Sequence, residues 1–224
     1  MPGTDPLEAV IFDMDGVLAD SEPLYYLSLN QVLTNHGHVP SEGADKEIRE
    51  MTLGTTAEYT WEWLRRHFGL EGDLGNWIAE YDGVVVKNLK EKVVPSPGVY
   101  ELLDSLKARG LRLALASSSQ GNWVEAVLSS LALQGRFEAV VSGDMVTRGK
   151  PDPEIFLLAA RKLAVEPQHC LVIEDSPHGI KAGKRAGMRV VAILTPYTRD
   201  LDLSEADQVL ESLQQFDYGV LDSA

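Results

Sequence analysis

The sequence has little cysteine, little positive charge and no long apolar run, and each shortage excludes a class of protein. The single cysteine, Cys170, excludes an internal disulfide and fits a reducing cytoplasm, where we expect the protein to work. A formal net charge of −14 argues against nucleic acid as a partner, because phosphate backbones attract basic faces. No apolar run approaches the ~20 residues that span a bilayer, and Asp5 and Glu8 are unlike a signal peptide, so we expect no membrane association.

The composition that remains is that of an ordinary globular protein. The chain has 224 residues, of which 44% are apolar and 24% are charged. That length can bury a proper core in one domain or two. An acidic protein that handled an anionic ligand would need to neutralise charge locally, with a metal ion and a few placed cations.

Six short apolar runs have strand character: Glu8–Phe12, Leu111–Ala116, Ala139–Val141, Cys170–Ile173, Val190–Leu194 and Gln208–Leu210. The later runs alternate with segments of helical period, as βαβ units do. They alternate poorly in polarity, which is typical of parallel strands covered on both faces. The pattern predicts an α/β fold with a Rossmann-like, doubly wound parallel sheet. Three helix starts are predicted from an N-cap residue followed by proline: Ser96-Pro97, Asp152-Pro153 and Ser176-Pro177.

Residues 20–93 show a different pattern. Apolar residues recur there at helical spacing in Leu24–Leu33, Ala57–Phe68 and Trp77–Leu89, and strand-like runs are absent. We therefore predict that residues 1–19 and 94–224 form the α/β core and that residues 20–93 are a helical insertion.

Polar side chains follow three of the predicted strands directly: Asp13 and Asp15, then Ser117, Ser118 and Ser119, then Glu174 and Asp175. The carboxyl ends of parallel strands share one edge of the sheet, where open α/β folds bind ligands. Lys150 precedes the next predicted helix on the same side. Helix N-termini at this edge would add free N–H groups that attract anions.

Each of these pieces is ordinary by itself, since a serine cluster usually marks a turn and a Lys-Pro dipeptide a surface loop. Their joint occurrence, in order and each after the right element, is not ordinary. Carboxylates for a hard cation, hydroxyl and amide donors, and one lysine are what a phosphoryl group bound with magnesium requires. The sequence therefore predicts a phosphoryl site that uses Mg²⁺.

The sequence resembles the phosphatases of the haloacid dehalogenase superfamily, in the β-phosphoglucomutase-like group that carries a helical cap. The matching motifs are Asp13-Met14-Asp15-Gly16, Ser117, Gly149-Lys150-Pro151-Asp152-Pro153 and Glu174-Asp175-Ser176. These motifs span most of the predicted α/β part, and residues 20–93 match the cap in placement and length.

The resemblance implies catalytic roles for Asp13, Asp15 and Lys150. Asp13 would attack phosphorus to form an aspartyl phosphate. Asp15 would protonate the leaving alcohol and then activate the water that cleaves the intermediate. Lys150 would hold a phosphate oxygen and restrain Asp13.

The resemblance also implies which groups hold the metal and the substrate. The Mg²⁺ ligands would be Asp13, the backbone carbonyl of Asp15, Glu174 and Asp175, with Glu174 binding either the ion or one of its waters. The phosphate would be held by the hydroxyl of Ser117, by Lys150, and by the backbone amides of Met14, Asp15 and Ser118.

Two features of the sequence favour hydrolysis over related reactions. The dehalogenases that name the family lack the second aspartate, here Asp15, and need no magnesium. The mutases of the same group carry a cap histidine and a cap arginine, and Tyr25 and Ala57 stand at about those places here. A phosphosugar mutase of the β-phosphoglucomutase type stays open as the alternative, as does a phosphoglycolate phosphatase.

The substrate class depends on the cap. The segment Asp20-Ser21-Glu22-Pro23-Leu24 resembles the sugar-phosphate and polyol-phosphate phosphatases of the family, so the expected partner is a small phosphorylated metabolite. Glu22 and Thr55 are the candidate cap contacts to substrate hydroxyls, although both could equally cap helices or line a hinge. We expect a monomer or a weak homodimer.

Overall fold

Apolar residues form six parallel strands in the larger of two units of the chain. The computed structural model describes residues 6–38, 48 and 57–222. The larger unit, called here the core unit, comprises Met1–Asp20 and Val93–Ala224, and the smaller, called the helical unit, comprises Ser21–Lys92. In these described residues, no helix is both long enough and apolar enough to cross a membrane.

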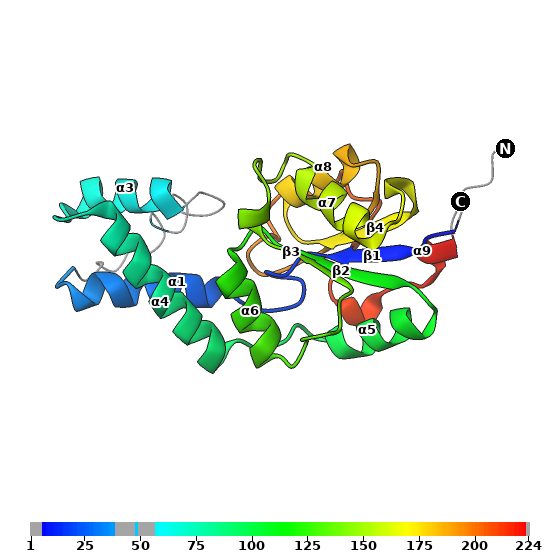
Figure 1. Ribbon diagram of the computed structural model, residues 1–224, viewed down its shortest axis with the longest axis horizontal. Helices are drawn as coiled ribbons and strands as arrows, with labels where there is room; N and C mark the ends of the chain where they lie inside the picture. The colour runs from blue at the N-terminus through cyan, green and yellow to red at the C-terminus, as the bar shows by residue number, and fades with distance from the viewer. Residues whose placement is uncertain (1–5, 39–47, 49–56, 223–224) are drawn as a thin grey trace. The chain divides into compact units, whose positions relative to one another are not determined.

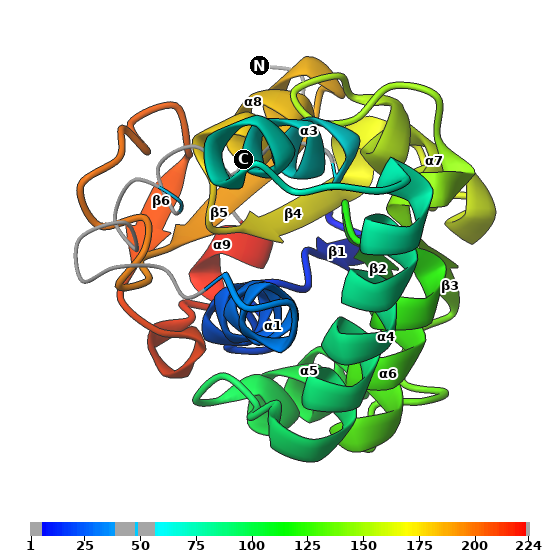
Figure 2. The ribbon, with the colours of Figure 1, turned by 90° about the vertical axis from the view of Figure 1, so that its left-hand side faces the viewer.

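The strands of the core unit are β1 (Ala9–Phe12), β2 (Arg112–Ala116), β3 (Ala139–Val141), β4 (Cys170–Glu174), β5 (Arg189–Ile193) and β6 (Gln208–Leu210). All neighbours are parallel, in the order β3-β2-β1-β4-β5-β6, which Figure 2 shows from one end. The predicted doubly wound sheet is confirmed, and the bounds of each strand differ from the predicted ones by at most one residue.

The position of β1 in the sheet explains why chemistry gathers at its end. From β1 the chain builds β2 and β3 on one side and then returns to build β4, β5 and β6 on the other. Phe12 lies level with Leu115 of β2 and with Ile173 of β4, so the residues after these three strands emerge together. A reversal of strand order is where open α/β sheets leave a crevice for ligands.

Helices cover both faces of this sheet: α5 (Val99–Ala108), α6 (Gly121–Ser130), α7 (Glu154–Leu163), α8 (Pro177–Arg185) and the short α9 (Gly219–Asp222). In Figures 1 and 2, α7 and α8 lie on one face and α5 and α6 on the other. Ile11 and Val172 from the strands pack with Ile155 and Phe156 of α7 in one buried cluster. Burial on both faces accounts for the continuous apolar runs of the strands.

The structure confirms one predicted helix start and moves two others. Ser176 caps α8, because its Oγ accepts a hydrogen bond from the N–H of Gly179 at 3.0 Å. Helix α7 begins at Glu154, one residue later than Asp152-Pro153 predicts. The start predicted at Ser96-Pro97 is wrong, because Gly98 with φ 88° forms a turn and α5 begins at Val99.

The helical unit contains α1 (Glu22–Asn35), α3 (Ala57–Phe68) and α4 (Leu74–Lys92), which include the three predicted helical segments. Both α1 and α3 pack against α4. Trp61 of α3 is fully buried and stacks on Trp77 of α4, with ring centroids 5.6 Å apart. Apolar burial within this unit is therefore sufficient reason for the helices described here.

Candidate active site

The loop after β1 begins the site. The N–H of Asp13 still donates to the carbonyl of Ile173 at 2.9 Å, so Asp13 continues the sheet. Gly16 then adopts φ 77°, a conformation that only glycine enters without strain. A Cβ on Gly16 would also overlap the carboxylate of Asp175, so the glycine lets the first motif and the last one approach each other.

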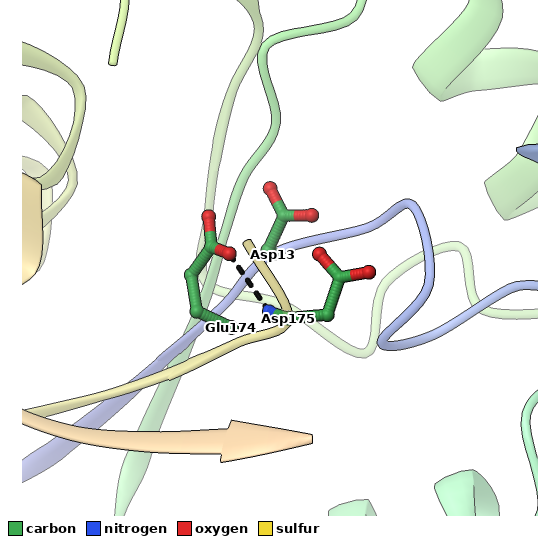
Figure 3. A group of neighbouring side chains, drawn as sticks. All are labelled: Asp13, Glu174 and Asp175. Atoms are coloured by element: carbon green, nitrogen blue, oxygen red, sulfur yellow. Dashed lines mark hydrogen bonds between the residues drawn. The ribbon is translucent and has the colours of Figure 1, made fainter. Parts of the chain in front are cut away.

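Three buried carboxylates meet at the ends of β1 and β4. Asp13, Glu174 and Asp175 each offer an oxygen, and these oxygens all lie within 4.8 Å of one another. Figure 3 shows the three side chains, with Asp13 and Asp175 side by side. Oxygen ligands bind Mg²⁺ at about 2.1 Å and Ca²⁺ at about 2.4 Å, so one hard divalent cation could bridge groups at this spacing. The donor set fits such an ion.

Lys150 is held between two of these carboxylates. Its Nζ donates to Oδ1 of Asp13 at 2.5 Å and to Oε1 of Glu174 at 2.6 Å. The same Nζ lies 4.9 Å from the centroid of the Phe156 ring, and only 7% of the side chain is exposed. Two charge-assisted bonds and an aromatic face therefore hold the ammonium group in place.

Burial and neighbouring charges shift the pKa values of Asp13 and Lys150 in this cluster. Burial raises the pKa of Asp13 from 3.8 to about 8, with Lys150 opposing the shift and the charges of Glu174 and Asp15 adding to it. Burial by itself would lower the pKa of Lys150, but the charges of Asp13 and Glu174 outweigh it and raise that pKa above its usual range. A bound divalent cation would favour the ionised form of Asp13 and so oppose the effect of burial on its pKa.

Glu174 is fixed by the N-terminus of α8. Its Oε2 accepts bonds from the N–H groups of Asp175 and Ser176, each at 2.8 Å, and from the Ser176 hydroxyl at 3.0 Å. A protein carboxylate therefore already accepts the N–H of Ser176, the cap residue of α8, where the sequence predicted donors for a ligand anion. The same holds at α6, where the N–H of Gly121 donates to Asp144 at 3.0 Å.

Gly179 leaves the space that Glu174 occupies, and this predicts an unusual effect of a helical alanine. A Cβ on Gly179 would overlap Oε1 of Glu174, the oxygen that contacts Lys150. We expect Gly179→Ala to lower the free energy of unfolding by about 1–3 kcal/mol, as overpacking does. Displacing Glu174 should also reduce turnover by roughly tenfold to 100-fold. Urea denaturation and steady-state kinetics measure the two effects.

Gly83 supplies the matched control for this substitution. It lies within α4, is exposed, and has no heavy atom within 4 Å of where its Cβ would be. Gly83→Ala should raise the free energy of unfolding by about 0.5–1 kcal/mol, because alanine loses less backbone entropy in a helix. Equal stabilisation by both substitutions would contradict the close approach of Glu174 to Gly179.

The carboxylate of Asp15 is held by the serines that follow β2. The hydroxyl of Ser119 donates to Oδ2 of Asp15 at 2.8 Å, and that of Ser117 lies 3.4 Å from the same oxygen. Ser117 Oγ also accepts the N–H of Ser119 at 3.0 Å. The second aspartate of the first motif is thus tied to the loop after the neighbouring strand.

Most residues that the sequence singled out for the site lie at this edge of the core unit. Hydrogen bonds or close carboxylate spacing connect Asp13, Lys150, Glu174 and Asp175, with Asp15, Met14, Ser117 and Ser118 in the adjoining loops. Glu22 lies in the first turn of α1 in the helical unit. Thr55 lies outside the described residues.

Sequence reasoning missed what Ser119, Phe156 and Gly179 do. The sequence did contain a signal for Ser119. Side chains two residues apart in an extended loop can point the same way, and Ser117 was already a candidate. For Phe156 and Gly179 there was no local signal, because their contacts to Lys150 and Glu174 depend on how the chain folds where it enters α7 and α8.

Comparison with known proteins agrees with this arrangement. The model of the haloacid dehalogenase-like hydrolases matches residues 10–193, most of the chain. The chain belongs to this family. The predicted membership of the superfamily and the predicted enzymatic class are therefore confirmed, and Asp13, Lys150 and Asp175 all fall within the matched span.

Two curated members of the family are similar over most of their length. The phosphorylated carbohydrates phosphatase of Thermotoga maritima is 34% identical over 204 residues, which cover 91% of this chain and 93% of that protein. The β-phosphoglucomutase of Bacillus subtilis is 33% identical over 196 residues, covering 84% and 83%.

A solved structure of the same family shares the fold. A mutant of CbbY from Rhodobacter sphaeroides, in complex with xylulose-(1,5)bisphosphate, matches with a TM-score of 0.83 and 28% identity. The match covers 97% of this chain and 100% of that one. The family fold therefore extends over essentially the whole of this chain.

Proposed function

We propose that the protein is a magnesium-dependent phosphatase that hydrolyses a small phosphorylated sugar or polyol through an aspartyl phosphate on Asp13. One observation carries the proposal: Asp13, Glu174 and Asp175 converge within 4.8 Å, and Lys150 bonds to two of them. A nucleophilic carboxylate, ligands for a hard cation and a fixed ammonium group are the parts that phosphoryl transfer needs.

In the first step an oxygen of Asp13 attacks phosphorus, and the bond from phosphorus to the leaving oxygen breaks. Lys150, already bonded to Oδ1 of Asp13, orients that carboxylate and offers its charge to a phosphate oxygen. Asp15 gives its proton to the leaving oxygen. The phosphoryl group is then held covalently on Asp13, and the alcohol product is neutral.

In the second step Asp15 takes a proton from water as the water attacks phosphorus, and the bond from phosphorus to Asp13 breaks. The products are inorganic phosphate and the original carboxylate of Asp13, with the proton back on Asp15. One group therefore serves as the acid and then as the base, so that two easier steps replace one difficult hydrolysis.

Mg²⁺ fits the buried carboxylates, and when bound it would offset the repulsion between the Asp13 carboxylate and a phosphate dianion. Asp13, Asp175 and the backbone carbonyl of Asp15 would hold the ion directly. Glu174 would hold one of its waters, because both oxygens of Glu174 already accept hydrogen bonds from Lys150 and from the start of α8.

The substrate class is supported by the relatives. One is named for phosphorylated carbohydrates, and the CbbY structure contains a sugar bisphosphate. We propose that residues 1–19 and 94–224 form the catalytic domain, and that residues 20–93 act as a cap from which Glu22 and Thr55 contact substrate hydroxyls. The organic part of phosphoglycolate would present only one carboxylate to the cap residues. We therefore rank phosphoglycolate second as a substrate.

A mutase is the one rival with an observation in its favour, namely the similarity to β-phosphoglucomutase. Tyr25 and Ala57 occupy about the positions where those enzymes use a histidine and an arginine. Neither tyrosine nor alanine can supply the positive charge that would hold a second phosphate. We therefore propose hydrolysis rather than isomerisation.

The test is release of inorganic phosphate from a panel of sugar and polyol phosphates. With MgCl₂ we expect phosphate to appear, and with EDTA we expect the rate to fall by about 100-fold or more, because a metal contributes several kcal/mol of charge stabilisation. Adding excess MgCl₂ back should restore the rate. Isomerised sugar phosphate without free phosphate would support the mutase, and neither product would refute both enzymatic proposals.

A further inference from the structure

The hydroxyl of Ser119 lies within hydrogen-bonding distance of Asp15. Its Oγ is 2.8 Å from Oδ2 of Asp15, the usual length of a hydroxyl-to-carboxylate hydrogen bond. The neighbouring hydroxyl of Ser117 lies 3.4 Å from the same oxygen, where such a bond is weak. Of these two donors to Oδ2, Ser119 is therefore the principal one.

The backbone holds Ser119 in place from two sides. Its N–H donates to Oγ of Ser117 at 3.0 Å, and its carbonyl accepts the N–H of Gly143 at 2.8 Å. Gly143 comes just after β3, and a Cβ there would overlap the carbonyl of Ser118. The Ser119 hydroxyl is thus placed by the end of a neighbouring strand and not by a flexible loop.

The two serines cannot exchange roles during the reaction. A hydroxyl has one proton to donate. When Ser117 donates its proton to a phosphate oxygen, as proposed above, it cannot donate it to Asp15 at the same time. Ser119 has its own proton, which it can donate to Asp15 when Ser117 bonds to phosphate, so the two hydroxyls are complementary.

We infer that Ser119 is a positioning residue that determines which oxygen of Asp15 transfers the proton, an inference that rests on the proposed function. An oxygen that accepts a hydrogen bond from Ser119 is best suited to be the carbonyl oxygen of the protonated acid, because the hydroxyl oxygen of a carboxylic acid is a poor acceptor. Oδ2 therefore stays bonded to Ser119, and Oδ1 carries the proton to the leaving oxygen and later takes one from water.

The test compares two aryl phosphates of similar size in the presence of MgCl₂. Nitrophenolate leaves p-nitrophenyl phosphate without needing a proton, whereas the leaving oxygen of phenyl phosphate benefits from one. We expect Ser119→Ala to lower kcat/KM for phenyl phosphate by about tenfold, and to leave that for p-nitrophenyl phosphate within about twofold of wild type. Ser119→Thr keeps a hydroxyl, so its ratio of the two rates should equal the wild-type ratio.

The controls separate this inference from the proposal beneath it. Ser129→Ala, at an exposed serine of α6, should change neither rate. An equal fall in both rates for Ser119→Ala would mean a general distortion of the site and would overturn the inference, as would no fall in either. Wild-type protein that releases no phosphate from either ester would instead overturn the proposed function, and the inference with it.

Discussion

Asp13→Asn is expected to abolish phosphate release while leaving the fold intact. An amide nitrogen or oxygen cannot form the proposed acyl phosphate, and no other carboxylate in the cluster replaces it, because Glu174 is bonded to the start of α8 and Asp175 lies against Gly16. Loss of a nucleophile typically costs about 10⁴-fold or more in turnover. Steady-state phosphate release measures the loss, and circular dichroism measures the fold.

Asp104→Asn is the matched control for this variant. Asp104 is an exposed aspartate of α5 that pairs with Arg136 on the surface, so its substitution should leave turnover unchanged. Turnover by Asp13→Asn within tenfold of wild type would refute the assignment of Asp13 as the nucleophile.

The same variant should differ from wild type in how stability depends on pH. Burial raises the pKa of Asp13 from 3.8 to about 8, so the folded protein binds this proton more tightly than the unfolded chain does. Stability without metal should therefore fall as the pH rises from about 4 to 8, and Asp13→Asn should lack that part of the fall. Thermal unfolding in EDTA across this range provides the comparison, and parallel curves for the two proteins would contradict it.

Lys150→Met is expected to have the largest effect on stability. Lys150 is the cation that bonds to Asp13 and Glu174, and its side chain is only 7% exposed. Removing one partner of a buried ion pair costs about 3–5 kcal/mol, because the remaining charge is left uncompensated. Turnover should also fall by about 10²–10³-fold, as it does when a donor to a transition-state oxygen is lost.

Urea denaturation at two pH values tests the cause of that destabilisation. If the unpaired Asp13 carboxylate is responsible, the deficit of Lys150→Met should shrink as the pH falls from about 9 to 7, because loss of Lys150 removes the charge that lowers the pKa of Asp13. Lys107→Met, at an exposed lysine of α5, should change the free energy of unfolding by no more than about 0.5 kcal/mol at either pH. A Lys150→Met midpoint equal to that of wild type would show that the ion pairs contribute nothing to stability.

The core motifs could be predicted because each comes directly after a strand that is easy to recognise. Short apolar runs without alternation indicate buried parallel strands, and the loops that leave the carboxyl ends of parallel strands all lie at one edge of the sheet. Asp13 and Glu174-Asp175 lie at the ends of β1 and β4, which are neighbours in the sheet. Their convergence therefore needed only the strand order that a doubly wound sheet adopts.

Details within the site could not be predicted in the same way. Ser96-Pro97 has the local pattern of a helix start, but Gly98 turns the chain and α5 begins only at Val99. Gly98 lies against Gln214, and a Cβ there would come within 2.7 Å of it. The start of α8 likewise has free N–H groups by local rules, yet Glu174 accepts the N–H of its cap residue, Ser176. In both cases a contact that forms only in the folded protein decides where the helix begins or which group its N–H groups bind.

By itself the sequence determined the parallel α/β core, the helical insertion and the set of acidic, hydroxyl and lysine side chains at one sheet edge, because hydrophobic periodicity and the residues that follow each strand are local properties of the chain. Only the tertiary structure decided how those side chains share the space. Lys150 bonds to both Asp13 and Glu174, Ser119 bonds to Asp15, and glycines make room for two of the carboxylates. Hydrogen bonds and steric overlap depend on distances of tenths of an ångström between segments far apart in the chain, and such distances exist only once the chain is folded.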